Sequence, residues 1–311
     1  MEIRPYISSQ TEEWNRFVAA SPNATFLFNR GYMDYHSDRF SDASMMAYGD
    51  DGRLLAILPA NLHDKILHSH QGLTYGGWVL SPKTDALTLT HIWDNWLRYC
   101  REEGMTEIYY KPLPYFYHDR PSHTDEYLLF RSGASIVETS LASTIDMQTW
   151  KGFSKTKRWE LSRGRRYGLP VEETSDTAAF VSLLTDCLHD RHNAVPVHSA
   201  AELELLRSRF PDRIRLFGIR ADGKMQAGVC MFDTGTVAHV QYICTTPLAR
   251  DMHLLPVIFH TLISETFSSR RWFDFGTSCE NGGMILNEGL LRQKTAFGAS
   301  PTVYTRYRLP L

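Results

Sequence analysis

Hydrophobic and polar positions follow the same order twice along the chain. Residues 45–62 contain two strand-like runs joined at an Asp-Gly pair, and residues 215–232 repeat this arrangement. A further strand-like run that leads into a proline follows each hairpin, at 73–82 and at 239–247. A weak internal repeat of this kind predicts two copies of one structural unit.

Each copy continues with a helix and then another strand. Apolar side chains recur at helical spacing in residues 85–101 and 254–267. Short strand-like runs follow at 106–112 and 271–278. Because strand, helix and strand follow one another in each copy, we expect a parallel crossover in each.

The repeat predicts the fold class α/β, with mixed sheets of the α+β kind in two tandem domains. Hairpins make part of each sheet antiparallel, and the crossovers make part of it parallel. We divide the chain into domains 1–145 and 146–311, each of ordinary domain size. No GxGxxG or GxxxxGK[ST] motif occurs, so the usual nucleotide-binding motifs give no support for a nucleotide site.

Composition excludes several function classes. The 311 residues carry 33 Lys and Arg against 35 Asp and Glu, a formal net charge of -2, so any site for a polyanion must be local. Five cysteines form no CxxC pair, so we expect free thiols, no disulfide framework and no metal. The first residues do not resemble a signal peptide and no apolar run has membrane length, so we expect a cytoplasmic protein without a membrane span.

Three motifs near the end of the chain are the most specific: FDFGTS at 273–278, LNEGL at 286–290 and KTAFG at 294–298. With the order of the predicted elements, they resemble the GNAT acyltransferase fold and, because the unit is duplicated, the Fem family. Fem proteins carry two such domains in tandem and join amino acids to cell-wall precursors. The resemblance implies transfer of an acyl or aminoacyl group to an amine, with the acceptor on domain 1–145 and the donor and catalysis on domain 146–311.

The donor is left open by one departure from the GNAT pattern. The motif [RQ]xxGx[GA] is expected after the strand that ends near Cys244, but TTPLARDM at 245–252 contains no glycine. Thr245, Thr246 and Arg250 are our candidate donor-binding residues, because a guanidinium beside a helix start can hold phosphate.

Three hypotheses for the function remain open, because this segment does not identify the donor. Our first is transfer from acyl-CoA to an amine of a cell-envelope or small-molecule acceptor. The alternative is a Fem-like aminoacyltransferase that uses aminoacyl-tRNA and extends a peptidoglycan precursor. A third is a binding protein that has lost its donor site. The sequence makes no prediction of the oligomeric state.

Candidate catalytic residues lie in the last part of the chain. We expect Lys294 to point across the cleft, where its ammonium can stabilise an oxyanion or bind a carboxylate of the acceptor. A plain surface lysine is the other interpretation. Glu280, in the loop after the last predicted strand, is a candidate base or orienting group for the amine, and Asn281 lies beside it.

A basic segment opens the second domain. Residues 151–170 carry seven basic side chains against the single acid Glu160, with aromatic residues between them. Lys155 and Arg158 are candidates to bind phosphates of tRNA, coenzyme A or a nucleotide-linked precursor. The alternative interpretation is an amphipathic helix with a solvated face. Asp274 alternates with Phe273 and Phe275, which favours a buried structural carboxylate.

Overall fold

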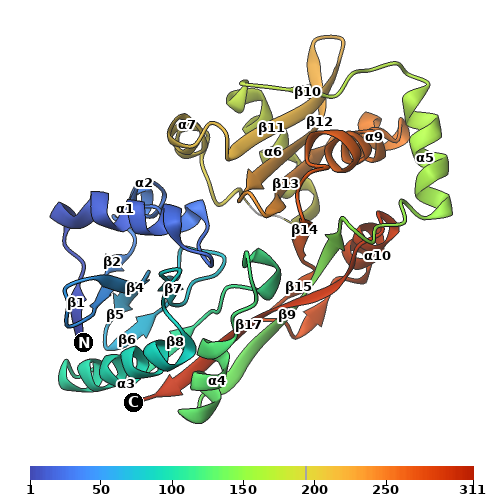
Figure 1. The fold of residues 1–311 in the computed structure, drawn as a ribbon. Helices are drawn as coiled ribbons and strands as arrows, with labels where there is room; N and C mark the ends of the chain where they lie inside the picture. The colour runs from blue at the N-terminus through green and yellow to red at the C-terminus, as the bar shows by residue number, and fades with distance from the viewer. Residues whose placement is uncertain (193–194) are drawn as a thin grey trace. The chain divides into compact units, whose positions relative to one another are not determined.

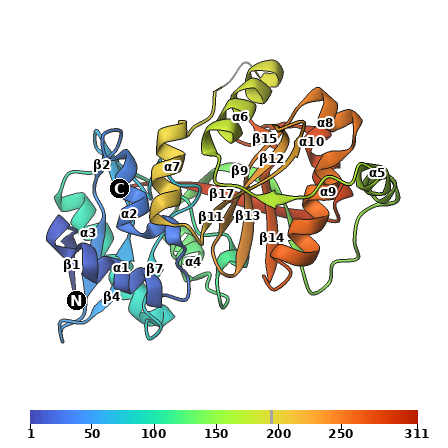
Figure 2. The same cartoon turned by 90° about the horizontal axis from the view of Figure 1, so that it is seen from above.

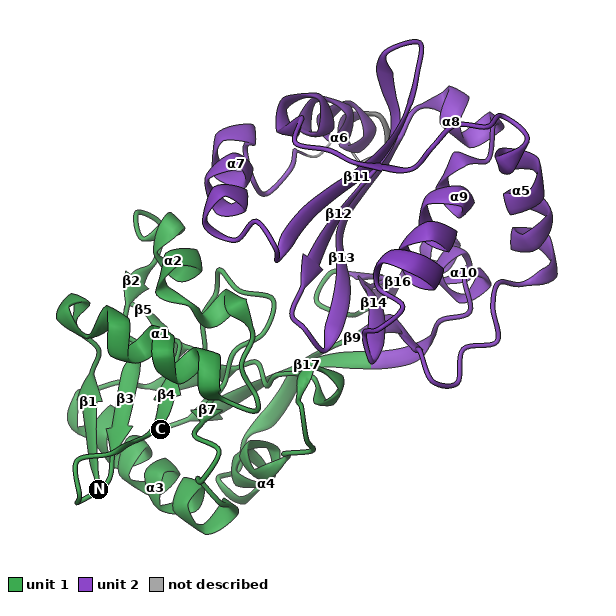
Figure 3. Ribbon diagram, turned by 45° about the horizontal axis from the view of Figure 1, so that its top comes forward, with its two compact units in different colours: residues 1–140, 281–284, 303–311 green, residues 141–280, 285–302 purple. Residues whose placement is uncertain are grey.

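The chain folds into two units, and two segments near its end return to the first. In this computed structural model, which describes residues 1–192 and 195–311, unit 1 contains residues 1–140, 281–284 and 303–311 (Figure 3). Unit 2 contains residues 141–280 and 285–302. The two units are therefore not two consecutive stretches of sequence, because residues 281–284 and 303–311 belong to unit 1.

Unit 1 combines short strands with helices (Figure 1). Its strands are β1 (Glu2–Pro5), β2 (Ser41–Asp42), β3 (Met45–Tyr48), β4 (Leu54–Leu58), β5 (Asn61–His63), β6 (Ile66–His68), β7 (Val79–Leu80) and β8 (Glu107–Tyr110), and its helices are α1 (Thr11–Ala20), α2 (Arg30–Met33), α3 (Ala86–Glu102) and α4 (Thr124–Arg131). Short 3-10 turns lie at Ser8–Gln10, Phe26–Phe28, Asp34–His36 and Tyr115–Tyr117.

The strands of unit 1 form two groups. One has the order β1-β3-β4-β7, and the other has the order β17-β8-β6-β5-β2, with part of β17 (Ser300–Pro310) at its end. Strands β6 and β8 pair in parallel, whereas β3 and β4 pair antiparallel. The group that contains β6 and β8 is mixed, as the sequence predicts, whereas all pairs in the group β1-β3-β4-β7 are antiparallel.

Helix α3 covers the core of unit 1. Asp85 caps its first turn by accepting the Thr88 N–H at 2.8 Å. The helix then buries Leu89, Ile92, Trp93, Trp96, Leu97 and Cys100, which recur at helical spacing. Trp96 packs edge-on against Trp93, with 4.9 Å between the ring centroids. Each fully buried side chain of this size contributes roughly 1.5–3 kcal/mol.

Unit 2 is built around a larger sheet. Its strands are β9 (Ser135–Asp146, shared with unit 1), β10 (Glu172–Glu173), β11 (Ile214–Ala221), β12 (Lys224–Asp233), β13 (Val237–Thr245), β14 (Trp272–Thr277), β15 (Cys279–Glu280) and β16 (Ile285–Leu286). Its helices are α5 (Lys155–Arg165), α6 (Thr177–His192), α7 (Ala200–Arg209), α8 (Pro247–Asp251), α9 (Leu254–Thr261), a π-helical turn (Leu262–Thr266) and α10 (Glu288–Ala296). The strand order is β10-β11-β12-β13-β14-β9, and β15 and β16 form a separate hairpin.

Helices cover both faces of the sheet of unit 2 (Figure 2). Helix α9 packs its apolar side on one face, where Phe259 meets Phe275 at 5.0 Å between ring centroids. Helix α6 lies on the other face, where Phe180 contacts the backbone of β12 so closely that a Cβ at Gly228 would come within 2.9 Å of its ring. These two layers fix the strands that position the site described below.

Local sequence signals account for both hairpins. Asp222 and Gly223 have φ of 49° and 73°, and Gly52 has φ of 75°, which is the left-handed backbone that tight Asp-Gly turns need. Antiparallel pairing of β3 with β4 and of β11 with β12 confirms the predicted hairpins. The predicted α/β fold with mixed sheets is confirmed.

The strand predicted at 73–82 is largely wrong. Only Val79–Leu80 forms a strand, β7, which pairs with β4. The preceding residues wind closely around β8 instead. Gly77 has φ of 90°, and a Cβ there would lie 2.6 Å from the Tyr110 hydroxyl. The path of this backbone is therefore set by its contact with a side chain that is distant in sequence.

Candidate functional site

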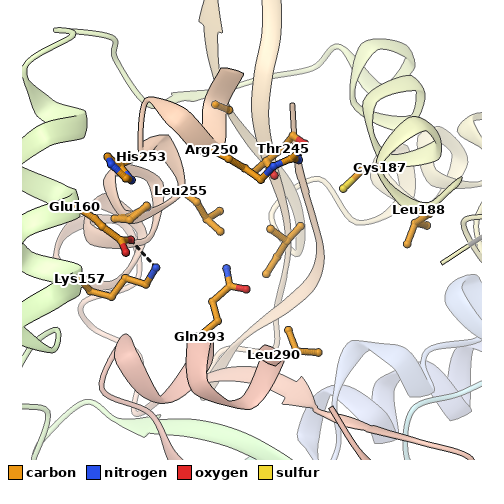
Figure 4. A pocket seen from close by; sticks show the side chains of 13 residues that line it. Lys157, Glu160, Cys187, Leu188, Thr245, Arg250, His253, Leu255, Leu290 and Gln293 are labelled. Atoms are coloured by element: carbon orange, nitrogen blue, oxygen red, sulfur yellow. Dashed lines mark hydrogen bonds and ion pairs between the residues drawn. The ribbon is translucent and has the colours of Figure 1, made fainter. Parts of the chain in front are cut away.

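The parallel strands β13 and β14 separate soon after they begin. The register pairs residues 237–239 with residues 272–274. A bulge follows in β13, where its pairing with β12 shifts register between Val240 and Tyr242. Strand β13 continues to Thr245, and a cavity of about 400 Å³ lies beside this part of the strand (Figure 4). The resemblance to the GNAT fold implies a donor in the gap between these two strands.

Six elements of unit 2 surround the cavity. The lining residues are Lys157 and Glu160 from α5, Cys187 and Leu188 from α6, Ile243 and Thr245 from β13, Ala249 and Arg250 from α8, His253, Leu255 and Pro256 at the start of α9, and Leu290 and Gln293 from α10. The wall opposite β13 therefore comes from α10 rather than from β14. Figure 4 shows Gln293 extending from α10 toward the centre of the cavity.

The cavity has an apolar part and a polar part. Ile243, Leu255 and Leu290 supply branched aliphatic surface that can contact a hydrocarbon chain or the arm of a cofactor. Lys157, Glu160 and Arg250 supply charge. This combination fits a ligand with one apolar and one anionic end.

Arg250 and Thr246 hold the backbone at the end of β13. Arg250 donates from Nη1 to the Thr245 carbonyl oxygen at 3.0 Å, and its side chain stays exposed. The Thr246 hydroxyl accepts the Ala249 N–H at 3.0 Å and donates to Gln226 Oε1 at 2.8 Å, so it caps α8. Of these predicted donor-binding residues, Thr245 and Arg250 line the cavity, while Thr246 shapes the turn behind it.

His253 turns the chain from α8 into α9. Its φ of 55° and ψ of 41° are left-handed, which is uncommon for a residue with a side chain. The turn places the first residues of α9, including Leu255 and Pro256, at the cavity. The first N–H groups of a helix have no acceptor within the helix, so this end of α9 carries positive partial charge.

Helix α5 reaches the cavity through a close contact with α9. A Cβ at Gly164 would lie 2.5 Å from the His253 carbonyl oxygen, so only glycine allows the two helices to approach this far. On the same side of α5, Lys157 and Glu160 form an ion pair of 2.5 Å that faces the cavity. The Lys157 ammonium also lies 5.3 Å from the centre of the Phe297 ring.

Lys294 belongs to α10, and its side chain lies beside the end of β14. It is 4% exposed, and its Nζ donates to the carbonyl oxygens of Gly276 at 3.0 Å and of Thr277 at 2.5 Å. Burial lowers the pKa of Lys294 to about 8, while the nearby Asp274 carboxylate acts in the opposite direction. Lys294 does not cross the cavity as we expect from the sequence, because two backbone carbonyls draw its ammonium toward the strand.

Asp274 is fully buried and contacts polar groups of its own strand and of the neighbouring strands. Its Oδ1 accepts the Gly276 N–H at 2.9 Å and the Thr144 hydroxyl at 3.2 Å, and its Oδ2 lies 2.7 Å from His239 Nδ1. These contacts match the buried structural carboxylate that the alternation with Phe273 and Phe275 favours.

The other predicted residues lie outside the set that lines the cavity. Glu280 is exposed on the β15–β16 hairpin and accepts from Asn287 Nδ2 at 3.1 Å, and Asn287 caps α10. Asn281 follows it with φ of 48° in the short segment that clusters with unit 1. Lys155 and Arg158 are exposed on α5, where Arg158 Nη1 donates to the Phe153 carbonyl oxygen at 2.8 Å.

Sequence reasoning missed Lys157, Glu160 and Gln293 as cavity residues. The signal for the first two was present, because buried Leu161 and Gly164 mark the inner side of α5 and Lys157 precedes them by one and two helical turns. No comparable signal exists for Gln293, whose direction depends on how α10 packs.

Two negative findings apply to the part of the chain that is described. None of the helices there combines the length and the apolar character needed to cross a bilayer. No three His, Cys, Asp or Glu side chains within it gather closely enough to hold a metal ion.

Comparison with known proteins identifies the second unit. Residues 153–282 match the family described as an acetyltransferase (GNAT) domain. No curated protein sequence matches the chain. Unit 2 therefore contains a GNAT acetyltransferase domain, and its cavity lies within the matched residues apart from the α10 wall.

Solved structures resemble the whole chain. The structure of FemX has a TM-score of 0.71 at 12% identity, with 100% of this chain and 98% of that chain covered. L-PGS from Bacillus licheniformis has a TM-score of 0.61 at 12% identity, with 98% and 92% covered. A tandem GNAT protein from the clavulanic acid biosynthesis pathway has a TM-score of 0.50 at 12% identity, with 99% and 98% covered. The tandem GNAT-like, Fem-like fold is confirmed.

Proposed function

We propose that this protein is an acyltransferase that moves an acyl group from acyl-CoA to an amine of a cell-envelope or small-molecule acceptor. The observation that carries the proposal is the cavity beside the diverging strands of a GNAT domain, whose lining combines aliphatic side chains with cations. In the reaction, the neutral amine attacks the thioester carbonyl. A C–N bond forms, the C–S bond breaks, and the proton of the amine ends on the coenzyme A thiolate.

The cations of the cavity would hold the phosphates of the donor. Arg250 is exposed on α8, directly before α9, and the first turn of α9 adds partial positive charge. Lys157 lies on the opposite wall, and its ion pair with Glu160 keeps the ammonium in position before the donor binds. Ile243, Leu255 and Leu290 would contact the apolar arm and the acyl chain.

Lys294 would act as a positioning residue. Its ammonium fixes the carbonyls of Gly276 and Thr277, where β14 leaves the sheet and Gly276 has φ of 66°. Glu280, through its bond to Asn287, would support the cap of α10 rather than act as a base.

One observation favours aminoacyl-tRNA as a second candidate donor. The outer side of α5 and its end present exposed cations next to the cavity wall, at Lys155, Arg158, Arg163, Arg165 and Arg166. The segment 245–252 also lacks the glycines that commonly approach coenzyme A phosphates. In this alternative, Fem-like case, the same cavity would take the aminoacyl end and α5 would contact the RNA backbone.

Donor binding tests the proposal first. Acetyl-CoA, a long-chain acyl-CoA, free coenzyme A and an aminoacyl-tRNA are titrated against the wild type and against Lys157→Met and Arg250→Met. We expect coenzyme A species to bind, with each substitution weakening them about tenfold, because one ion contact to phosphate is lost. Arg292→Met is the matched control, since Arg292 is exposed on α10 and paired with Glu288.

The outcomes separate the three functions. Binding of aminoacyl-tRNA without binding of coenzyme A would replace the first donor by the second. Binding of an acyl-CoA without transfer to any amine in a broad acceptor set would indicate a binding protein. For an active enzyme, Lys294→Ala should lower kcat on the order of a hundredfold while donor affinity stays within about threefold. An unchanged kcat would remove Lys294 from the site.

A further inference from the structure

Unit 1 carries a polar surface on one face of strands β6, β8 and β17. The register places His68 and Arg308 directly opposite Tyr109, so these side chains share a face. The alternating residues Leu67, Ile108 and Leu309 point to the core on the other face.

Two cations meet at one end of this face. Lys111 directly follows β8, and its Nζ donates to the Leu73 carbonyl oxygen, which leaves two further N–H groups on the ammonium. Arg306 lies on the neighbouring strand, β17. Its Nη2 lies 2.7 Å from Glu138 Oε2, and its guanidinium lies 5.9 Å from the centre of the Tyr109 ring.

The cluster contains a donor that the protein leaves unused. Arg306 Nε is shielded from solvent and, among the residues that the structure describes, has no hydrogen-bond partner. Buried donors are normally satisfied, so an orphan N–H beside a second cation points to an acceptor that binds there.

Charge is unbalanced at the same place. Burial, followed by the charge of Arg306, lowers the pKa of Lys111 to about 8, whereas Glu138 acts in the opposite direction. Glu138 is already bonded to Arg306. Burial, followed by the charge of Lys111, lowers the pKa of His68 to about 4, so its imidazole is neutral at pH 7. One carboxylate therefore faces two cations.

A balanced pair on the same face gives the contrast. Arg308 binds Glu107 through two bonds, from Nε at 3.0 Å and from Nη2. Both partners are satisfied there, and one charge meets one charge. The surplus at Lys111 and Arg306 is therefore a local property and does not extend over the whole face.

We propose that Lys111 and Arg306 form an anion-binding site in unit 1 that holds a phosphate or carboxylate group of a ligand, with the Tyr109 ring beneath it. The anion takes the remaining N–H groups of Lys111 and the Nε–H of Arg306. That this ligand is the acceptor rests on the proposed function. The binding itself does not, and its test measures binding alone.

Titration with inorganic phosphate and with succinate tests the site on the full-length protein. Each probe is followed by thermal shift and calorimetry, and all variants are also made in a Lys157→Met/Arg250→Met background, which removes the cations of the unit 2 cavity. We expect saturable binding of at least one probe. Lys111→Met and Arg306→Met should each weaken it tenfold or more in both backgrounds, and Arg308→Met, which removes the same charge, should change it less than twofold.

The two probes distinguish the source of the anion, since preference for phosphate indicates a phosphorylated ligand and preference for succinate a carboxylate. Failure of both probes to bind the wild type would overturn the proposal. An equal loss in Arg308→Met would also overturn it, because the effect would then be general surface charge. If Lys111→Met does not fold, Arg306→Met, on an exposed side chain, decides alone.

Discussion

Gly164 is the residue through which α5 approaches α9, and its replacement by alanine tests whether this contact shapes the cavity. The added Cβ would lie 2.5 Å from the His253 carbonyl oxygen and 2.7 Å from Val257 Cγ2. The first of these atoms is backbone, so it cannot rotate away. Helix α5 must therefore move outward, and Lys157 and Glu160 must move with it.

The magnitude follows from two opposing effects. Ordinary contact begins at 3.4 Å, so the helices must separate by roughly 0.9 Å at this point. Overpacking of this kind costs about 1–3 kcal/mol, and the better helix propensity of alanine returns about 1 kcal/mol. We expect Gly164→Ala to lower the free energy of unfolding by about 1 kcal/mol, which corresponds to a fall in Tm of roughly 2–4 °C.

Urea denaturation and donor titration provide the assay. Acyl-CoA affinity should fall about tenfold in Gly164→Ala because the Lys157 contact to phosphate is displaced. Gly289→Ala is the matched control, since Gly289 also lies in a helix but its Cβ would meet only Asn287 Oδ1 at 3.7 Å. It should leave both quantities unchanged or raise stability slightly. A Gly164→Ala protein as stable as the wild type, with unchanged donor affinity, would refute this account of the cavity wall.

Two predictions concern pH. Because burial lowers the pKa of Lys294 from 10.5 to about 8, the unfolded chain holds this proton more tightly between these values, so stability rises with pH there. The free energy of unfolding of the wild type minus that of Lys294→Met should increase by up to ~3 kcal/mol from pH 8 to 10.5 in urea denaturation, and a constant difference would contradict the burial of the charge. Burial raises the pKa of Asp125 from 3.8 to about 6, so the folded protein holds this proton more tightly and the corresponding difference from Asp125→Asn should decrease by up to ~3 kcal/mol as pH rises through that range. A difference that increases with pH would mean that the bond from the Tyr110 hydroxyl at 2.9 Å outweighs burial.

Local signals were sufficient for much of the fold. The Asp-Gly pairs specify both hairpins because left-handed backbone is needed at the turns. Helix α3 follows from the spacing of Leu89, Ile92 and Trp96 and from the cap at Asp85. Such features depend on residues that are close in sequence, and the same was true of the strand that carries Thr245 to the cavity. The short helix α8, which carries Arg250, was not predicted.

Features that depend on distant residues were not predictable. The segment 73–82 has a strand-like pattern, yet most of it forms no strand, because its backbone at Gly77 packs against the Tyr110 hydroxyl. Lys294 has the right helix and position, but its direction is set by the carbonyls of Gly276 and Thr277. None of these contacts leaves a trace in local periodicity.

The return of β17 to unit 1 bears on the order in which the protein folds as it is synthesised. Residues 307–310 pair with β8 and bring Leu309 into the core of unit 1 (Figure 1). The ribosome makes these residues after all the other residues of both units that precede them in the chain. Until they appear, the nascent unit 1 has an open strand edge at β8, where other strands can add. The unit whose synthesis begins first is therefore completed last, directly after the final residues of unit 2 have been made.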